Sequence, residues 1–339
     1  MLSLRTQVLA VLCLLAACSV SATAASLYVS DIGLYDVMVF DATTGALTGT
    51  LTPTGGWGSP SGIAVAPNGD VYVADMYNNT VNRFDGSGAF LGIFANSELT
   101  SPTGMAWGPD GYLYVANSGD GGQSYIVRFD AAGNPVDASP FVPSSTGLYY
   151  PGAIAFGPDG NLYIADSSNG AVDKVIRTTG AFSTLVPPGC PSTPFSNPQG
   201  VAFGPDHNLY VSDAGYGCAD GSVPGGWADF GVYTYDTDGN LLGTFVAPNV
   251  LSTPIDLAFG PNGNLYVTDS QSRVVQFDGA TGGWIGEFIA NGGSSGPLNN
   301  PTFLAFSGTS GSVPEPAAVG LMGLGLAGLA LLRFRCRAR

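Results

Sequence analysis

The chain has 339 residues, of which 50 are glycine and 24 are proline, and 10% are charged while 11% are aromatic. This composition is typical of a turn-rich β protein and excludes a disordered chain, which would lack the aromatic residues. The formal net charge is −15, and residues 25–312 hold only five basic side chains against 24 carboxylates. Such an acidic surface repels phosphate backbones, so the composition excludes nucleic acid as a partner.

Residues 1–24 have the layout of a secretory signal peptide. Arg5 precedes an apolar run at 8–17, and the small residues at 22–24 form a cleavage pattern. The apolar run is too short to span a bilayer. An alternative interpretation remains open, because residues 15–18 resemble a lipoprotein lipobox in which Cys18 would be acylated. Both interpretations predict export.

The middle of the chain repeats a strand that begins with tyrosine and ends with a carboxylate or its amide. Six copies occur, at residues 28–31, 72–75, 114–117, 163–166, 210–213 and 266–269. A second motif, a proline followed by a short apolar strand, also occurs six times, beginning at Pro60, Pro102, Pro151, Pro198, Pro254 and Pro301. A period of about 48 residues indicates a repeat architecture.

Tight turns such as Pro158-Asp159-Gly160 connect the two motifs, since proline presets φ and glycine accepts a positive φ. Two further strands follow in each repeat, and four antiparallel strands form a propeller blade. The chain begins with a tyrosine strand and ends with an unpaired proline strand, so both termini would build the last blade. The sequence therefore predicts an all-β, six-bladed β-propeller of four-stranded blades over residues 25–312, closed by its N- and C-terminal strands.

The repeat resembles NHL-type propellers over about residues 26–307. The segments that carry the resemblance are 157–160, 162–166 and 198–203. The resemblance implies the fold, but it leaves the activity open because such propellers act as lyases, lactonases, sensors and adhesive platforms.

Loops after the tyrosine strands vary in length, and the longest covers residues 214–231. Variable loops on a rigid scaffold are the usual place for binding. Aromatic side chains on this face could stack on sugar rings, and the candidates are Trp57, Tyr77, Tyr125, Tyr150, Tyr216 and Trp227. The alternative is that these rings pack the loops onto one another.

Acidic side chains offer two further candidates. The residues that end the tyrosine strands, among them Asp75 and Asp269, would either form a calcium-binding ring or cap their own turns. No cofactor is expected, and calcium is the alternative. Asp256 is an unusual charge on an inner strand, where Gly62, Gly104 and Gly200 occupy the matching positions. We include Asp256 among the candidate ligand-binding residues.

Cys190 and Cys218 are the two cysteines of the predicted propeller, and both lie in loops of the same face. Export to an oxidising compartment predicts a disulfide between them, worth about 3 kcal/mol if it is unstrained.

Residues 313–339 contain Val313, Pro314, Glu315 and Pro316, then an apolar stretch at 317–332 and a basic cluster. A transmembrane anchor with the propeller outside is the interpretation from physics alone. The three parts in this order resemble the PEP-CTERM sorting signal. That resemblance implies processing by an exosortase-type protease, transient membrane attachment through the C-terminal helix, and a final location at the cell surface or outside the cell.

The functional hypothesis is a non-catalytic surface module that binds extracellular polysaccharide or another envelope component. A passive matrix or biofilm protein is the first alternative. A metal-dependent enzyme of the lactonase or lyase kind is the second alternative. The lyases that this repeat resembles use histidines, whereas this chain has one, His207, in a hairpin turn where structure alone explains it. No Ser-His or Cys-His pair indicates nucleophilic catalysis.

Overall fold

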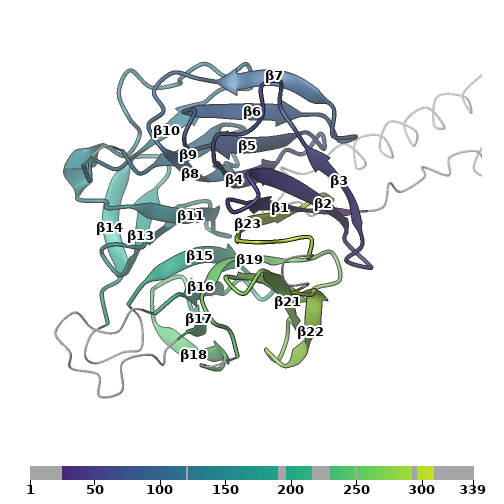
Figure 1. Cartoon of the computed structure of the whole chain (residues 1–339). Coiled ribbons are helices and arrows are strands. Elements are labelled where there is room, and N and C mark those ends of the chain that lie inside the picture. Colours follow the sequence, from purple (N-terminus) through teal and green to yellow (C-terminus); the bar gives the residue numbers. More distant parts are fainter. Residues whose placement is uncertain are drawn as a thin grey trace, which may run out of the picture.

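The structure is a computed structural model, and it describes residues 25–119, 121–189, 196–215, 230–248, 250–291 and 296–308. These residues form six antiparallel sheets around a common centre (Figure 1). Each sheet is one blade, and we name the blades A to F. The predicted six-bladed β-propeller is confirmed.

Each blade extends from an innermost strand at the centre of the ring to an outer edge strand. In this order, blade A contains β23 (Pro301–Phe306), β1 (Ser26–Asp31), β2 (Asp36–Asp41) and β3 (Leu47–Leu51), and blade B contains β4 (Pro60–Val65), β5 (Val71–Asp75), β6 (Thr80–Phe84) and β7 (Phe90–Ala95). Blade C contains β8 (Pro102–Trp107), β9 (Leu113–Asn117) and β10 (Tyr125–Phe129), and blade D contains β11 (Pro151–Phe156), β12 (Leu162–Asp166), β13 (Ala171–Ile176) and β14 (Ala181–Val186). Blade E contains β15 (Pro198–Phe203), β16 (Leu209–Asp213), β17 (Gly231–Tyr235) and β18 (Leu241–Val246), and blade F contains β19 (Pro254–Phe259), β20 (Leu265–Asp269), β21 (Arg273–Phe277) and β22 (Trp284–Ile289). A short 3-10 helix, η1, covers Ser144–Thr146.

Blade A is closed by the two ends of the described chain. Strand β23 pairs with β1, with Leu27 opposite Phe306 and Tyr28 opposite Ala305. The backbone N–H of Ser26 also donates to Ser307 Oγ at 2.7 Å. The predicted closure by N- and C-terminal strands is therefore confirmed.

The tyrosine of each second strand joins its blade to the next one. The Tyr114 ring lies edge-on to Phe156 of blade D, with ring centroids 4.8 Å apart, and Tyr163 contacts Phe203 of blade E in the same way at 4.8 Å. In five of the six joints this partner is an aromatic residue at the end of the next blade's inner strand, whereas Tyr28 of blade A packs in a cluster with Val65. Edge-to-face packing at this spacing is favourable, so the repeated tyrosine stabilises the ring itself.

The inner strands approach one another so closely that small residues are required. A Cβ atom on Gly62 would lie 2.1 Å from the Thr103 carbonyl oxygen, and one on Gly104 would lie 2.4 Å from that of Gly152. Real Cβ atoms do not reach such distances, because protein interiors are close-packed. Glycine at these positions thus sets the width of the ring's centre.

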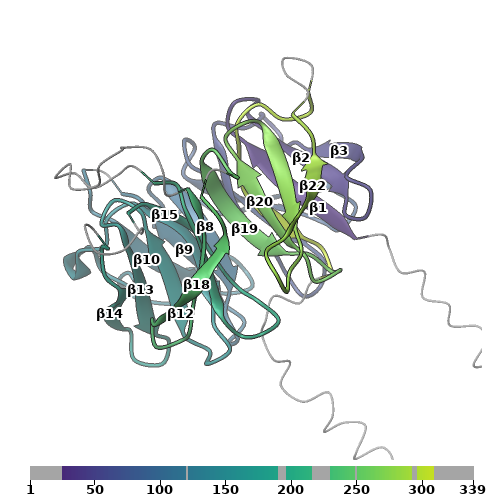
Figure 2. The same cartoon turned by 90° about the horizontal axis from the view of Figure 1, so that it is seen from below.

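The turns between first and second strands and between third and fourth strands share one face, which we call the tight-turn face. The remaining loops form the variable-loop face. Figure 2 shows the ring from below, with blades C and D on one side and blades A and F on the other. Since every blade contributes connections to both faces, each face is built on all six blades.

Blade C departs from the prediction because it has three strands rather than four. Its outer segment pairs with β10 only through isolated bridges, between Ile126 and Val142 and between Phe129 and Pro135. Three prolines, at 135, 140 and 143, remove backbone donors from this segment. Proline cannot donate to a β ladder, which explains the irregular edge.

Candidate functional site

The acidic residues that end the second strands cap turns, and they also tie down the loop that leads into the same blade. Asp75 accepts from the backbone N–H groups of Gly58 and Ser59 at 2.8 and 2.9 Å, and from that of Asn78 at 3.1 Å. Asp31 does the same at the closing blade, where Asn299 donates to it. Buried carboxylates that accept several N–H groups hold loops in place, so these oxygens are occupied within the fold.

Two of the predicted ligand-binding aromatics are explained by packing. Trp57 Nε1 donates to the Leu51 carbonyl at 2.7 Å, and its ring packs 5.8 Å from that of Phe84. The Tyr125 hydroxyl donates to Thr100 Oγ1 at 3.1 Å, and its ring packs against the core between blades B and C. Both side chains therefore contribute to loop packing, and their part in ligand binding stays a prediction.

Tyr77 and Tyr150 are different, because they remain 80% and 49% exposed. Both lie on the variable-loop face. The structure adds Tyr35, which the sequence interpretation did not include and which is 60% exposed in the turn after β1. Its signal in the sequence was weak, since Tyr35 follows closely on the repeated tyrosine strand and resembles the start of the next strand. These three residues are exposed aromatics on one face.

Two of the three adopt a strained backbone conformation. Tyr35 has φ 54° and Tyr150 has φ 59°. This turn position has a positive φ in other blades too, where the residue is Asn79 in blade B, Gly170 in blade D and Ser272 in blade F. The left-handed region costs a non-glycine residue about 1 kcal/mol. An exposed tyrosine recovers little of that cost by burial, so stability does not explain why tyrosine stands here.

Asp256 lies buried on the inner strand β19, at the joint between blades F and A. Its side chain is buried, and Oδ2 accepts from the backbone N–H of Leu304 at 3.1 Å, across the joint between blades F and A. Burial raises the pKa of the Asp256 carboxyl to about 7. The carboxylate therefore bridges two inner strands where other blades bring their backbones into direct contact.

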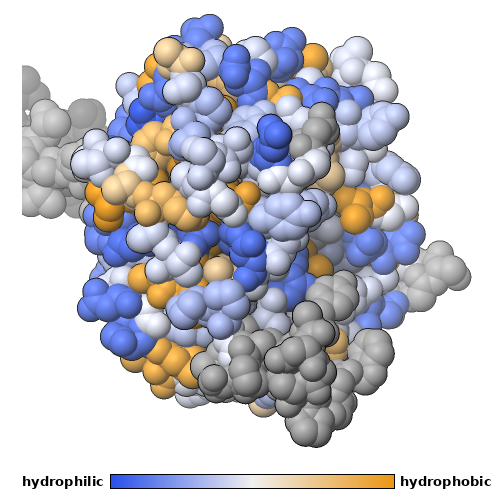
Figure 3. Space-filling model, turned by 90° about the vertical axis from the view of Figure 1, so that its left-hand side faces the viewer, coloured by the Kyte–Doolittle hydropathy of each residue, from blue (hydrophilic) through white to orange (hydrophobic). Residues whose placement is uncertain are grey.

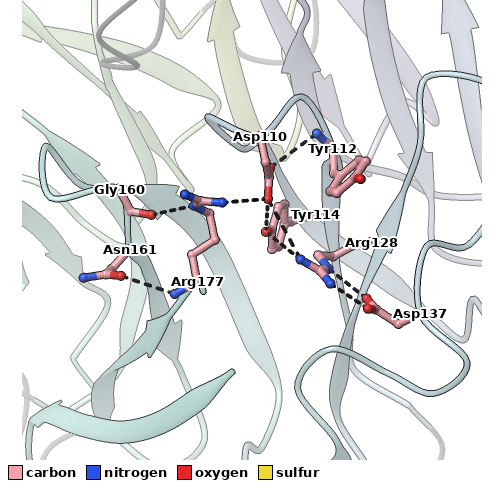
Figure 4. Close-up of polar contacts among 8 residues, drawn as sticks. All are labelled: Asp110, Tyr112, Tyr114, Arg128, Asp137, Gly160, Asn161 and Arg177. Carbon is pink, nitrogen blue, oxygen red and sulfur yellow. Dashed lines mark hydrogen bonds and ion pairs between the residues drawn. The ribbon is translucent and has the colours of Figure 1, made fainter. Parts of the chain in front are cut away.

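All five basic side chains of the propeller are engaged with carboxylates. Arg83 pairs with Asp70, Lys174 with Asp159, and Arg273 with Asp269 and Glu287. The other two, Arg128 and Arg177, belong to the network in Figure 4. Within the described residues, every basic side chain of the propeller is thus paired with a carboxylate.

The network in Figure 4 joins blades C and D on the tight-turn face. Arg128 donates two hydrogen bonds to Asp137, of 2.7 and 2.6 Å. Its guanidinium lies 4.3 Å from the centre of the Phe141 ring. Arg177 donates to Asp110 at 3.1 Å and to the Gly160 carbonyl at 3.2 Å. The Tyr114 hydroxyl donates to the same Asp110 oxygen at 2.9 Å.

Several predicted site residues lie outside the described residues. They are Tyr216, Trp227, Cys190, Cys218 and the sorting motif at 313–316. The disulfide and the contribution of the long loop to a binding face stay predictions. Within the described ranges there is also no cluster of three or more potential metal ligands. No helix in the part of the chain that the structure describes is long and apolar enough to cross a membrane.

Family models match two segments of the chain. An NHL repeat matches residues 58–84, and the PEP-CTERM protein-sorting motif matches residues 312–335. Among curated proteins the chain has no match. The chain thus carries an NHL repeat within a six-bladed propeller and an export-associated sorting motif at its C-terminal end.

Solved structures share the fold at low sequence identity. A chain of the nidogen/laminin complex is 16% identical with a TM-score of 0.64, and the match covers 84% of this chain and 98% of that one. A protein of unknown function from Bacteroides caccae is 16% identical with a TM-score of 0.59, covering 84% and 99%. A catalytically inactive histidine-to-alanine variant of virginiamycin B lyase from Staphylococcus aureus is 17% identical with a TM-score of 0.57, covering 85% and 94%. These likenesses concern the fold alone.

Proposed function

We propose that this six-bladed propeller, with its NHL repeat and PEP-CTERM motif, is an exported surface protein that binds extracellular polysaccharide through its variable-loop face. The PEP-CTERM motif implies export and processing by an exosortase. The observation that carries the binding proposal is a group of exposed tyrosines on that face, among them Tyr35, Tyr77 and Tyr150. A tyrosine offers an apolar ring for a sugar face and a hydroxyl for its hydroxyl groups.

The backbone supports a functional reason for two of these residues. Tyr35 and Tyr150 occupy left-handed conformations that glycine adopts without cost. Strained residues concentrate at functional sites, where selection for binding outweighs the loss of stability. The proposal therefore predicts that replacing such a tyrosine weakens ligand binding but leaves the free energy of unfolding nearly unchanged.

The test measures saturable binding of the full chain to a panel of neutral and acidic bacterial polysaccharides, by calorimetry. We expect Tyr35→Gly and Tyr77→Ser each to weaken binding about tenfold, because stacking on one ring is worth about 1 to 1.5 kcal/mol. Tyr35→Gly should also leave the free energy of unfolding within about 1 kcal/mol of the native value, since the strain is relieved. Trp284→Leu is the matched control, because Trp284 is an exposed aromatic on the outer strand β22. Equal loss of binding in all three variants, or no saturable binding to any polysaccharide, would contradict the proposal.

One observation favours the alternative of a passive matrix protein. The outer strands β3, β7, β18 and β22 expose apolar side chains, among them Leu91, Ile93, Leu242 and Ile285. Of these strands, β3, β7 and β18 carry no charged residue, and uncharged edge strands favour association between chains. In Figure 3, the side of the molecule at the left of Figure 1 shows only small, separated apolar areas. Sedimentation over a concentration series distinguishes the two functions, because a matrix protein would self-associate without any glycan.

The enzyme alternative has less support. The virginiamycin B lyase variant with similar fold is described as catalytically inactive after a histidine was replaced. The one histidine of this chain, His207, is exposed in a hairpin turn at φ 66° on the tight-turn face. That position belongs to the turn between β15 and β16.

A further inference from the structure

Two departures from the repeat meet at the joint between blades C and D. The first is the irregular outer segment of blade C. The second is the turn that connects the third and fourth strands of blade D. In the five other blades this turn begins with an aspartate, followed by a small residue or threonine; the five aspartates are Asp41, Asp85, Asp130, Asp236 and Asp278. Blade D has Ile176 and Arg177 instead.

The substitution reverses the local charge. In the other blades the aspartate accepts backbone N–H groups of its own turn, as Asp41 does from Thr43 and Thr44 at 3.0 and 2.8 Å. The turn of blade D forms without this cap, since the N–H groups of Thr179 and Gly180 donate to the Ile176 carbonyl. The turn therefore loses a stabilising carboxylate and gains a guanidinium that it does not need for its own conformation.

The turn of blade D stands further from the backbone of the preceding blade than four of its five counterparts do. Each turn of this type places a glycine against the outer segment of the preceding blade. In four of the other blades a Cβ atom on this glycine would lie 1.9 to 2.6 Å from the facing carbonyl oxygen; the four are Gly45, Gly133, Gly239 and Gly282. In blade B the nearest atom to a Cβ on Gly88 belongs to the Leu51 side chain, at 3.2 Å. A Cβ atom on Gly180 would lie 3.6 Å from the carbonyl oxygen of Phe141. The turn of blade D thus stands away from blade C, and a pocket of about 310 Å³ opens between them.

The walls of this pocket carry polar groups that the fold leaves available. Arg128, Asp137, Ser139, Phe141, Arg177 and Thr178 are among the lining residues. Arg177 uses Nε and Nη1 within the fold, and in the described residues its Nη2 has no partner. The same holds for the hydroxyls of the exposed Ser139 and Thr178. A pocket of this size whose lining residues carry a guanidinium and two hydroxyl groups suits one sugar residue.

The charges of the pocket make it a better place for an acidic ligand group than the rest of the tight-turn face. Two guanidiniums and the carboxylates of Asp110 and Asp137 cancel here, while the other five turns of this type each contribute an uncompensated aspartate at their first position. The Nη2 of Arg177 can still donate to a carboxylate, and such charge-assisted hydrogen bonds are stronger than those between neutral groups. Salt screens the negative charge of the remaining surface beyond about 8 Å at physiological ionic strength.

We propose that the pocket between blades C and D is a second glycan site, which binds a carboxylate-bearing sugar residue with Arg177 as the group that pairs with its carboxylate. The site extends the proposed function to the opposite face of the propeller, and it does not depend on the tyrosines of the variable-loop face. A chain with both sites would bind glycans on its two faces and link them.

The probe is methyl β-D-glucuronide, compared with methyl β-D-glucoside, and binding to the full chain is followed by NMR or calorimetry. We expect saturable binding of the glucuronide, at least tenfold tighter than that of the glucoside, and a weakening with added salt. Arg177→Ala should weaken glucuronide binding at least tenfold, and Arg177→Lys should lose less.

The repeat supplies its own control for folding. Ile176→Asp together with Arg177→Ala turns residues 176–181 into the sequence found at residues 41–46, which forms the same kind of turn in blade A. This double variant should fold normally and lose glucuronide binding. Tyr77→Ser should retain it, which separates this site from the variable-loop face. Equal binding of the two glycosides, unchanged binding by the double variant, or no saturable glucuronide binding up to about 50 mM would overturn the assignment.

Discussion

The carboxyl groups of Asp166 and Asp173 share a hydrogen bond between the neighbouring strands β12 and β13, and both side chains are buried. Two carboxylates this close cannot both ionise without repulsion, so one retains its proton. Burial, together with the Asp166 charge, raises the pKa of Asp173 to about 7. Other blades place a neutral residue here, such as Val127 or Val275.

This pair makes the stability of the propeller depend on pH. The folded chain holds a proton on Asp173 between pH 4 and 7 that the unfolded chain releases, so the free energy of unfolding falls as pH rises through that range. Asp173→Asn mimics the protonated acid. We expect the variant to be at least about 2 kcal/mol more stable than the native chain at pH 8, at about 1.4 kcal/mol for each unit of pKa shift, and equally stable near pH 4. Urea unfolding at both pH values measures the difference.

Asp85→Asn provides the control for that experiment. Hydrogen bonds from Ser87 hold the pKa of Asp85 below its usual range. Its contribution is therefore present at neutral pH and lost as pH falls. The two variants should differ from the native chain with opposite pH trends, and parallel trends would contradict the assignment of the raised pKa to Asp173.

The sequence predicted the ring, its closure and the order of the strands because each blade repeats the same residues for the same physical reason. Tyr163 recurs because it packs on the next blade, and Gly62 recurs because the inner strands touch. The candidate site residues were predicted less well than the fold. Whether an aromatic residue is buried or exposed depends on its exact place in a loop, which separates Trp57 from Tyr77. The role of Arg177 could not be predicted from its own blade, because its partner Asp110 lies in the neighbouring blade, 67 residues away in the sequence.

The narrow centre of the ring can be tested at Gly62. Gly62→Ala would place a Cβ atom 2.1 Å from the Thr103 carbonyl oxygen, so the inner strand of blade B must move. Overpacking of this kind costs about 1 to 3 kcal/mol or more. Gly286→Ala on the outer strand β22 is the matched control, because no atom lies within 4 Å of the new Cβ. Thermal and urea unfolding should rank the native chain and Gly286→Ala together, well above Gly62→Ala; equal stability of the two variants would mean that the inner strands have room to spare.

Asp256 gives a test of the joint between blades F and A. Its carboxyl accepts from the Leu304 N–H, and burial raises its pKa to about 7. Asp256→Asn preserves an acceptor and removes the buried charge, so it should stabilise the chain at pH 8 and change little near pH 4. Asp256→Ala leaves the Leu304 N–H without this partner. Hydrogen exchange at the Leu304 amide should therefore accelerate in Asp256→Ala and stay slow in Asp256→Asn, and similar exchange in both variants would show that the carboxyl does not hold this joint.

The pairing of Arg128 with Asp137 fixes the irregular edge of blade C, which forms one wall of the proposed glycan pocket. The two side chains are 16% and 28% exposed and make two short hydrogen bonds. A bidentate, partly buried pair contributes more than an exposed one. We expect Arg128→Gln and Asp137→Asn each to destabilise the chain by about 1 to 3 kcal/mol, and the double variant to lose clearly less than the sum, with a coupling of about 1 kcal/mol or more. Limited proteolysis should also cut first between residues 131 and 141 in each single variant. Additive losses, or cleavage elsewhere in the propeller, would mean that the prolines alone hold this edge in place.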